Sequence, residues 1–353
     1  MELSNKSINK ILLINLAFIG DVILSTPVAR ALRERYPAAQ IDFMTIPLSA
    51  DIARLNPYIN NVIAYDKRGK HRQLGALWQL IRYLRSQKYD LAISTNFAPR
   101  GAMLAWVSGI PYRVGYRAQH GEWFLTHVAS AERSAVKHEA ENQLDVLKPL
   151  GISTKDASLV LRLDKTDEDQ VAAKVKKTEG KPLVIICPYG SYWKKSWTTD
   201  GYIALVKELS QYADCCLIGG PGEREQLENI NEQTGNKAQV FGGTLTLGQL
   251  SALISIAALL ITVDTGPLHI AQAVGTPVLA LFGPTDPKGW GPRGGDCAVI
   301  YHPSPCSPCW GKGDCPDHIC MMAIATDEVT GLARQMLKEG EEHVNNGTHS
   351  RQE

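Results

Sequence analysis

Strand-like apolar runs alternate with helix-like periodic segments along almost the whole chain, and this alternation restricts the fold more than any other feature. Parallel strands need crossover connections, so repeated strand–helix pairs predict parallel sheets covered by helices. The pattern runs in two series, which are separated by a polar stretch at residues 163–180. The expected strands are 10–16, 40–45, 91–94, 183–187, 215–218, 239–241, 259–263 and 278–282, and the expected helices are 21–35, 201–212, 223–233, 247–256 and 267–274.

We therefore expect an α/β protein with two doubly wound, Rossmann-like domains, residues 1–165 and 180–338. A chain of 353 residues is too long for one average domain and suits two. Ligands of such proteins commonly bind in the cleft between domains. A loop rich in Cys and Pro, residues 303–321 (the Cys-rich loop), precedes a last helix at 327–338 that we expect to cross back to the first domain. Residues 340–353 are expected to form a polar, frayed tail.

The composition is that of a globular protein with a full core, because 44% of the residues are apolar and 21% are charged. The least charged stretch, 249–263, is shorter than the roughly 20 residues of a membrane span and contains three hydroxyl side chains. The first residues run directly into a strand and form a poor signal peptide. Eight cysteines without an export signal indicate reduced thiols or metal ligands before disulfides, so a cytoplasmic location is expected.

The net charge of +1 conceals an asymmetry between the two halves. The first 150 residues contain 19 Lys and Arg against 12 Asp and Glu, and the remainder contains 18 against 24. Much of the basic excess lies at 67–72 and in the helix-like segment 73–88. A basic amphipathic segment of this kind suits an anionic membrane surface or an anionic substrate. A helix with its apolar stripe on the core and a solvated basic face is the alternative.

The turn after the apolar run 259–263 has the features of an anion-binding helix start. Asp264, Thr265 and Gly266 end the run, and Pro267 suits the first turn of the next helix. Unpaired backbone N–H groups and the positive end of the macrodipole attract phosphate there, and glycine allows a close approach. The turn predicts a phosphorylated ligand, and an ordinary strand-to-helix turn capped by Asp or Thr is the alternative.

Two other strand ends in the second half offer similar groups. After the strand 183–187, Gly190 and Ser191 supply an amide and a hydroxyl, and the lysines that follow supply charge for a phosphate. The strand 215–218 leads into a Gly-rich turn with Glu223, which is a ligand or simply a first-turn acid. Three strand ends of one domain thus favour a phosphorylated, hydroxyl-rich ligand.

The first strand is followed by a turn that does not match G-x-G-x-x-G, and G-x-x-x-x-G-K-[ST] occurs nowhere in the chain. A dehydrogenase or a kinase therefore lacks its usual signature. Asp21 stands at the carboxyl end of this first strand. It is a helix cap, or a general base if its side chain reaches a substrate hydroxyl.

Five motifs stand in order along the chain: Ile19-Gly20-Asp21-Val22, Lys195-x-Trp197, Gly219-Gly220-Pro221-Gly222-Glu223, Asp264-Thr265-Gly266-Pro267-x-His269-Ile270-Ala271 and Leu281-Phe282-Gly283-Pro284-Thr285. Together they resemble the ADP-heptose:lipopolysaccharide heptosyltransferases, which are glycosyltransferase family 9 and have the GT-B fold. The resemblance covers residues 10 to about 335 and implies two Rossmann-like domains that face each other across a cleft. It implies an inverting glycosyltransferase that moves heptose from ADP-L-glycero-D-manno-heptose to the inner core of lipopolysaccharide.

The resemblance also implies residue roles. Asp21 would be the general base that deprotonates the acceptor hydroxyl, and Lys195 would neutralise the departing pyrophosphate together with the amides of the helix start. Asp264 would bind sugar hydroxyls and Glu223 the ribose, while His269 would approach the phosphates or pack in the core. The implied donor-binding residues are Ser191, Lys195, Glu223, Asp264, Thr265, Gly266 and His269.

No metal is implied for catalysis, because a lysine and a helix dipole replace the divalent ion of other sugar transferases. The implied acceptor is an anionic glycolipid at the cytoplasmic face of the inner membrane, which suits the basic first half and implies peripheral membrane contact. Nucleic acid is not an expected partner. Arg100, Arg113 and Arg117 are the candidate acceptor contacts.

The Cys-rich loop holds Cys306, Cys309, Cys315 and Cys320 within fifteen residues. Four sulfurs could form a tetrahedral zinc or iron site of structural character. The spacing is not that of two C-x2-C knuckles, so disulfides or free thiols are the alternative. Some transferases that resemble this family carry such a cysteine metal site, and several heptosyltransferases lack the cysteines.

Two further functions stay open at this stage. One is a protein (adhesin) O-heptosyltransferase or another nucleotide-sugar transferase of the same fold, since acceptor loops differ most. The other is a non-catalytic nucleotide-sugar binding protein. Asp21 argues against the second, because a binding module needs no base at that position.

Overall fold

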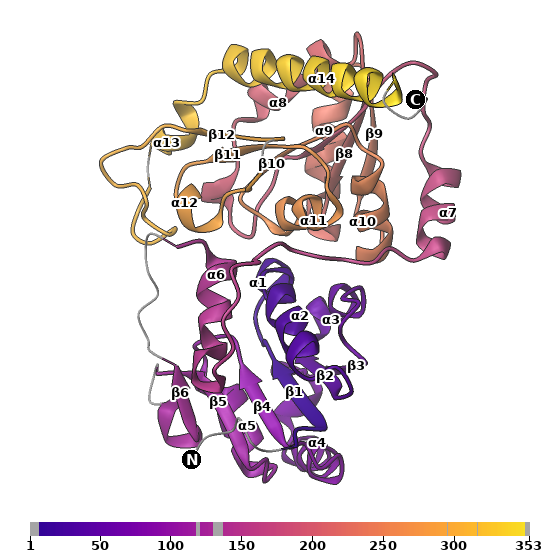
Figure 1. Ribbon diagram of the computed structural model, residues 1–353. Coiled ribbons are helices and arrows are strands. Elements are labelled where there is room, and N and C mark those ends of the chain that lie inside the picture. Colours follow the sequence, from indigo (N-terminus) through magenta and orange to yellow (C-terminus); the bar gives the residue numbers. More distant parts are fainter. Residues whose placement is uncertain (1–6, 118–120, 130–136, 295, 316, 350–353) are drawn as a thin grey trace. The chain divides into compact units, whose positions relative to one another are not determined.

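The computed structural model describes residues 7–117, 121–129, 137–294, 296–315 and 317–349. The chain divides into two compact units, Met1–Arg162 (unit 1) and Leu163–Glu353 (unit 2) (Figure 1). The division falls at the start of the polar stretch that the sequence suggested as a linker, and α7 (Lys165–Lys174) forms within that stretch. Asp164 starts this helix, since its carboxylate accepts a hydrogen bond from the backbone N–H of Thr166 at 2.8 Å.

Unit 1 is built on a six-stranded parallel sheet with the strand order β3-β2-β1-β4-β5-β6. Helices connect its parallel strands, as the alternating pattern predicted (Figure 1). Its elements are β1 (Lys10–Ile14), α1 (Ile19–Leu24), α2 (Thr26–Arg35), β2 (Gln40–Thr45), α3 (Pro47–Arg54), β3 (Asn61–Ala64), the short 3-10 helix η2 (Lys70–Arg72), α4 (Leu74–Ser86), β4 (Leu91–Ser94), α5 (Pro99–Val107), β5 (Tyr112–Tyr116), η3 (Gly121–Phe124), β6 (His127–Ala129), α6 (Glu139–Leu144) and η4 (Asp145–Leu150).

The single helix expected over residues 21–35 is two helices in the structure. The break falls at Ser25, whose hydroxyl donates a hydrogen bond to the Val22 carbonyl at 2.6 Å. Pro27 then sits in the first turn of α2, where its missing N–H costs nothing. Asp21 therefore belongs to a separate six-residue helix that begins directly after β1.

Unit 2 repeats the architecture with the strand order β12-β11-β10-β7-β8-β9, again parallel throughout. β7 lies in the middle, with β8 on one side and β10 on the other. The elements after α7 are β7 (Leu183–Cys187), η5 (Trp193–Lys195), α8 (Thr199–Leu209), β8 (Asp214–Gly219), η6 (Pro221–Glu223), α9 (Arg224–Gln233), β9 (Ala238–Gly242), α10 (Leu247–Ser255), β10 (Leu259–Val263), α11 (Gly266–Val274), β11 (Val278–Phe282), α12 (Pro287–Trp290), β12 (Cys297–Tyr301), α13 (Ile319–Met322) and α14 (Thr326–His349). The predicted class of two doubly wound α/β domains is confirmed.

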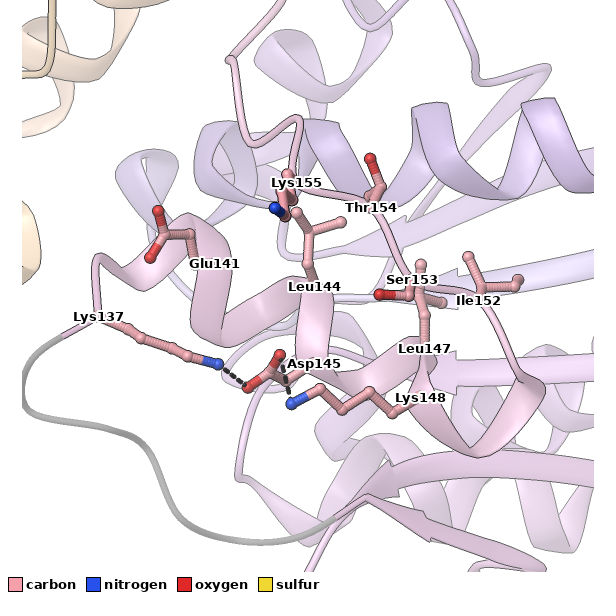
Figure 2. Close-up of a pocket in the computed structure, with 10 residues that line it drawn as sticks. All are labelled: Lys137, Glu141, Leu144, Asp145, Leu147, Lys148, Ile152, Ser153, Thr154 and Lys155. Atoms are coloured by element: carbon pink, nitrogen blue, oxygen red, sulfur yellow. Dashed lines mark hydrogen bonds and ion pairs between the residues drawn. The ribbon is translucent and has the colours of Figure 1, made fainter.

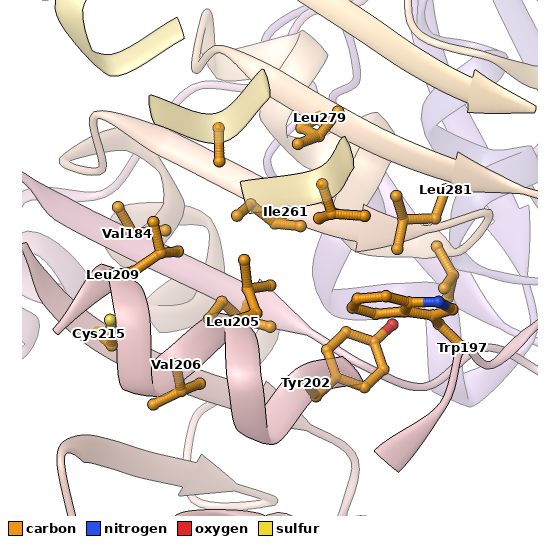
Figure 3. Close-up of a cluster of buried hydrophobic side chains, with 14 of the residues drawn as sticks. Val184, Trp197, Tyr202, Leu205, Val206, Leu209, Cys215, Ile261, Leu279 and Leu281 are labelled. Carbon is orange, nitrogen blue, oxygen red and sulfur yellow. The ribbon is translucent and has the colours of Figure 1, made fainter. Parts of the chain in front are cut away.

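The core of unit 2 fixes the loop that follows β7. Trp197 and Tyr202 pack edge to face, with ring centroids 5.1 Å apart, inside a cluster of buried aliphatic side chains (Figure 3). The Trp197 indole donates to the Ile324 carbonyl at 3.0 Å, and the Tyr202 hydroxyl donates to the Pro188 carbonyl at 3.1 Å. The loop 188–197 is therefore attached to the core at both of its ends.

The last helix is longer than the sequence suggested, because α14 continues to His349 where a polar tail was expected after residue 338. It packs along α8, and Val329, Ala333 and Leu337 are buried in the core of unit 2, although the sequence led us to expect a return to the first domain (Figure 1). In the described part of the chain, no helix combines the length and apolar character that crossing a membrane requires.

Candidate active site

Lys195 and Asp264 form a nearly buried ion pair at the carboxyl edge of the unit 2 sheet. The Lys195 Nζ lies 2.7 Å from the Asp264 Oδ2, and the two side chains are 12% and 7% exposed. The residues follow β7 and β10, which are neighbours in the sheet with Cys187 opposite Thr262. Because parallel strands end at the same edge, the two turns meet there. The connection after β7 crosses to β8 on one side, and the connection after β10 crosses to β11 on the other side. The crevice between two such connections is the usual ligand site of open α/β sheets.

The turn that carries Lys195 requires a glycine. A Cβ added at Gly190 would lie 3.0 Å and 3.1 Å from the Cβ and Cδ of Lys195, and 3.5 Å from the Asp264 carbonyl oxygen. The lysine stem thus crosses directly over Gly190 to reach Asp264. The Lys195 ammonium also lies 5.0 Å from the centroid of the Tyr192 ring, which adds a cation–π contact.

Helix α11 begins immediately after Asp264, at the same edge of the sheet. Thr265 precedes it in an extended conformation, and among the described residues no side chain caps the helix start. Pro267 stands in the first turn, and the helix ends at Gly275, whose φ of +82° is the left-handed conformation that glycine tolerates. The uncapped amides and the helix dipole give this end a partial positive charge beside Lys195.

His269 lies inside the protein in the first turn of α11, with only 2% of its surface exposed. Burial lowers the pKa of His269 to about 4, and the opposing charges of Asp264 and Lys195 act on it in addition. Its Nδ1 has no hydrogen-bond partner among the described residues. The imidazole is therefore neutral at neutral pH.

Glu223 closes the turn after β8. Its Oε2 accepts a hydrogen bond from the backbone N–H of Gly220 at 2.6 Å, and a Cβ at Gly219 would come within 2.7 Å of the same oxygen. Burial raises the pKa of Cys187, the last residue of β7, to about 12, and the Glu223 carboxylate contributes to this shift. Glu223 follows β8, which pairs with β7 in parallel, so the two turns are at the same edge of the sheet. Ser191 is exposed in the loop after β7.

Asp21 occupies the first turn of α1, half-buried, at the carboxyl end of the central strand β1 of unit 1. Two buried amides hold its main chain: the Asn15 Nδ2 donates to the Asp21 carbonyl at 3.1 Å, and the Gln143 Nε2 donates to it at 3.3 Å. Sequence reasoning missed the Gln143 contact, because nothing in the sequence indicates that α6 reaches the turn after β1.

Arg100 lines a cavity of about 320 Å³ in unit 1 together with Lys67 and Arg68. The Arg100 guanidinium donates to the Tyr65 hydroxyl at 3.3 Å, and the Lys67 ammonium donates to the Leu16 carbonyl at 3.2 Å. Burial lowers the pKa of Lys67, and the neighbouring cations Arg68 and Arg100 lower it further. Three cations around one cavity form a suitable site for an anionic group. Lys67 and Arg68 were noted only as part of a basic segment.

The other two acceptor candidates occupy different surroundings. The Arg113 guanidinium bonds to three main-chain carbonyls, those of Ile110, Pro111 and Phe124, and burial lowers the pKa of Arg113. This engagement holds the start of β5 together, so we leave Arg113 out of the acceptor site proposed below. Arg117 is exposed directly after β5.

The four cysteines of the Cys-rich loop are near one another without forming a ready-made metal site. Burial raises the pKa of Cys320, and Cys315, Cys306 and Cys309 raise it further, so these thiols share one neighbourhood. All four are free thiols. Among the described residues, no three His, Cys, Asp or Glu side chains are grouped closely enough to hold a metal.

A second cavity in unit 1, of about 330 Å³, lies between α6 and the segment after η4 (Figure 2). Lys137 and Lys148 both pair with Asp145 there, at 2.8 Å and 2.9 Å. Lysines that are neutralised in this way offer little attraction for an anion. None of the predicted site residues lines this cavity.

The fold and the position of the site define the class of protein as a GT-B glycosyltransferase. The structure of a glycosyl transferase family 9 protein from Veillonella parvula DSM 2008 is similar with a TM-score of 0.82, at 25% identity, and the match covers 96% of this chain and 99% of that one. The structure of Escherichia coli ADP-heptose lps heptosyltransferase II has the same fold, with a TM-score of 0.79 at 22% identity over 94% of this chain and 99% of that one.

Sequence comparison then gives the family. The model of glycosyltransferase family 9 (heptosyltransferase) matches residues 77–319. Lipopolysaccharide heptosyltransferase 3 of Escherichia coli (strain K12) is 32% identical over 293 residues, which are 77% of this chain and 82% of that protein. The chain belongs to glycosyltransferase family 9, and the predicted family is confirmed.

Proposed function

We propose that the protein transfers heptose from ADP-heptose to the inner core of lipopolysaccharide, with inversion at the anomeric carbon. The observation that carries the proposal is the nearly buried Lys195–Asp264 pair beside the uncapped start of α11, in a chain of family 9. The relatives are named as lipopolysaccharide heptosyltransferases, and structures of one heptosyltransferase hold ADP or an ADP-heptose analogue. These names favour a lipopolysaccharide acceptor over a protein acceptor.

In the proposed reaction, the Asp21 carboxylate removes the proton of the acceptor hydroxyl. The hydroxyl oxygen forms a bond to the anomeric carbon of the heptose while the bond from that carbon to the diphosphate oxygen breaks. ADP leaves with the bonding electron pair, and the Lys195 ammonium and the amides at Thr265 and Gly266 stabilise its added charge. A single displacement of this kind inverts the anomeric carbon.

The donor contacts follow from the same geometry. Asp264, which already holds Lys195, is proposed to bind hydroxyls of the heptose, so the sugar and the diphosphate meet at the ion pair. One carboxylate oxygen of Glu223 accepts a hydrogen bond from the Gly220 amide, and we propose that this carboxylate also binds the ribose. Ser191 is exposed on the loop beside them. His269 is assigned to shaping the floor of the site as a neutral ring.

For the acceptor, we propose that the cavity lined by Lys67, Arg68 and Arg100 binds a phosphate or carboxylate group. Arg117 is retained as a weaker candidate because it is exposed at the end of β5. Replacing Arg100 by Ala should raise the KM for the acceptor about tenfold and leave the KM for the donor unchanged. An equal rise in both constants would contradict this assignment.

We propose that catalysis needs no metal, because Lys195 and the helix start already provide positive charge for the leaving group. The four cysteines offer sulfur ligands, which zinc and iron favour. Their side chains would have to move closer together to bind a metal ion. Any metal in the Cys-rich loop is accordingly assigned a structural role. Transfer should persist in a chelator that removes free divalent ions, and metal analysis of the purified protein tests the loop.

We also propose that unit 1 contacts an anionic membrane surface. The exposed side of α4, α5 and η3 carries Leu74, Trp78, Trp106 and Trp123, which are 75%, 56%, 52% and 77% exposed. α4 and α5 lie side by side (Figure 1), and the Arg85 guanidinium donates to the Val107 carbonyl at 2.7 Å. Trp residues of this kind favour the membrane–water interface.

Charge supports a lipid partner for this surface over a second copy of the chain. Residues 67–89 contain seven Lys and Arg and no Asp or Glu. Two copies of such a surface would repel each other, whereas anionic lipid headgroups attract it. The double variant Trp78→Ser/Trp106→Ser should bind phosphatidylglycerol vesicles at least about tenfold more weakly, given the apolar area removed. Trp193→Ser, which removes a Trp of similar exposure in unit 2, is the matched control. Unchanged vesicle binding by the double variant would overturn the assignment.

The proposed reaction is tested by single-turnover transfer with purified protein, comparing ADP-heptose with UDP- and GDP-sugars on a deacylated lipopolysaccharide core acceptor. ADP-heptose should be the preferred donor. Asp21→Asn should retain donor affinity and lose transfer by about a thousandfold, the scale of general base catalysis. Absence of turnover with ADP-heptose, or full turnover by Asp21→Asn, would overturn the proposal.

A further inference from the structure

Lys194, the neighbour of Lys195, points away from the donor site and into the Cys-rich loop. Its ammonium donates hydrogen bonds to the carbonyls of Gly311, at 3.1 Å, and Gly313. One lysine thereby fastens two carbonyls of a segment that has little secondary structure of its own. Hydrogen bonds from an ammonium to carbonyl oxygens are among the stronger ones in proteins.

The loop returns a hydrogen bond to the same residue. The His318 Nε2 donates to the Lys194 carbonyl at 2.6 Å, so the proton of the imidazole lies on that nitrogen. The His318 ring also packs edge-on against Trp193, with centroids 5.3 Å apart. His318 has a φ of +46°, a left-handed backbone conformation that is uncommon for a residue with a side chain.

A third contact joins the loop to Tyr192. Gly311, with a φ of +71°, lies so close that an added Cβ would come within 2.7 Å of the Tyr192 ring. The Lys195 ammonium lies 5.0 Å from the centroid of the same ring. Three successive residues, 192 to 194, therefore contact the Cys-rich loop, and the next residue is Lys195.

The loop itself is anchored to the sheet. The backbone N–H of Trp310 donates to the Pro284 carbonyl at 2.8 Å, and the Ser307 hydroxyl donates to the Gly283 carbonyl. Both carbonyls follow β11. The sheet thus supports the loop, and the loop supports the turn that carries Lys195.

We propose that Lys194 is a positioning residue, which ties the Cys-rich loop to the η5 turn and so sets where the Lys195 ammonium meets the donor diphosphate. The proposal rests on the donor role of Lys195 given above. It assigns a function to a loop that no step of the transfer reaction uses directly. A lysine placed even slightly wrongly loses much of its interaction with a bound diphosphate.

The test is a double-mutant cycle read out by calorimetric titration with ADP. Lys194→Met should raise the dissociation constant of ADP about tenfold, because the η5 turn loses its hold on the Cys-rich loop and the Lys195 ammonium is displaced. In the background of Lys195→Met, the same substitution should have little further effect, because its action passes through Lys195. Lys194→Arg should restore most of the affinity, and Lys237→Met, an exposed lysine elsewhere in unit 2, should leave it unchanged.

The outcomes separate this proposal from the one on which it rests. If Lys195→Met itself leaves ADP affinity unchanged, the donor role of Lys195 is wrong and the positioning role falls with it. If Lys195→Met weakens ADP binding but Lys194→Met does not, only the positioning role is overturned. An equal loss from Lys194→Met in both backgrounds would also overturn it, since the effect would then be general. His318→Phe, which removes the hydrogen bond and keeps the ring, should weaken ADP binding in the same direction if the loop acts as proposed.

Discussion

The Lys195 ammonium and the Asp264 carboxylate lie 2.7 Å apart, although they follow different strands and three α-helices separate them in the chain. Both side chains are almost fully withdrawn from water, so neither charge is solvated independently of the other. The pair is therefore a structural element of unit 2 as well as a candidate binding site. Its loss should affect stability and activity separately.

Lys195→Met should lower the free energy of unfolding by about 3 kcal/mol, because it leaves the Asp264 carboxylate buried without its partner. The double variant Lys195→Met/Asp264→Leu should recover most of this loss, since no charge remains to be buried, and should still fail to transfer heptose. Urea unfolding and a transfer assay on the same preparations check both statements. Equal instability of the single and double variants would contradict this account.

Gly190→Ala should reduce transfer at least about tenfold, since its Cβ would press on the Lys195 stem at 3.0 Å and displace the ammonium. Gly222→Ala is a matched control in the next turn of the same edge, where an added Cβ meets nothing within 4 Å. The measurement is kcat and the KM for the donor for the two variants. Comparable activity in both would show that the close approach at Gly190 does not matter.

The stability of unit 2 should depend on pH through His269. Its folded-state pKa of about 4 lies below the ordinary value of 6.5, so the unfolded chain binds more protons between these values and stability is lost as the pH falls through this window. The free energy of unfolding should drop by about 2 kcal/mol between about pH 7.5 and about pH 5 from this group alone.

His269→Gln should remove that part of the pH dependence, because its side chain does not titrate. His127→Gln, which changes a half-exposed histidine of unit 1, should leave the pH dependence of the unfolding free energy of unit 2 unchanged. Denaturant unfolding at the two pH values, followed by a probe in unit 2, supplies the comparison. If His269→Gln leaves the pH dependence of the unfolding free energy unaltered, another group is responsible for it.

Gln143→Met should lower kcat about tenfold and leave the KM for the donor unchanged, because Gln143 holds the carbonyl of Asp21 in unit 1 and the donor residues belong to unit 2. Gln233→Met, which is exposed on α9, is the control. Steady-state kinetics at saturating acceptor give both constants. A rise in the donor KM with unaltered kcat would show that Gln143 does not act through the proposed base.

Local signals in the sequence were sufficient for most strands and for the helix that follows β10. The apolar run 259–263 and the helix after Pro267 match the structure closely, because burial on both faces and a Pro at a helix start leave clear local patterns. The break at Ser25 was missed, because both halves of the segment have helical periodicity and Pro27, which marks the start of the second helix, was not weighed against it.

What could not be predicted depends on contacts between distant segments. Nothing in the sequence states that β7 and β10 are neighbours, so the pairing of Lys195 with Asp264 emerges only from the strand order. The same holds for Lys194, whose partners lie in the Cys-rich loop. Arg113 was proposed as an acceptor contact from its charge alone. Its hydrogen bonds to three main-chain carbonyls depend on the packing of η3 against β5, which the sequence does not reveal.

The burial of α14 in the core of unit 2 has a consequence for how the protein is made. Leu337 and Ala333 pack in the same cluster as Val184 and Leu205. The Ile324 carbonyl, just before α14, accepts a hydrogen bond from the Trp197 indole N–H. During translation, the strands of unit 1 are complete once Ala129 has been added, so that unit can fold early. The apolar surfaces of β7 and α8 must instead wait until the last helix has left the ribosome. Nascent chains that stall late in synthesis should therefore be the ones that need chaperones.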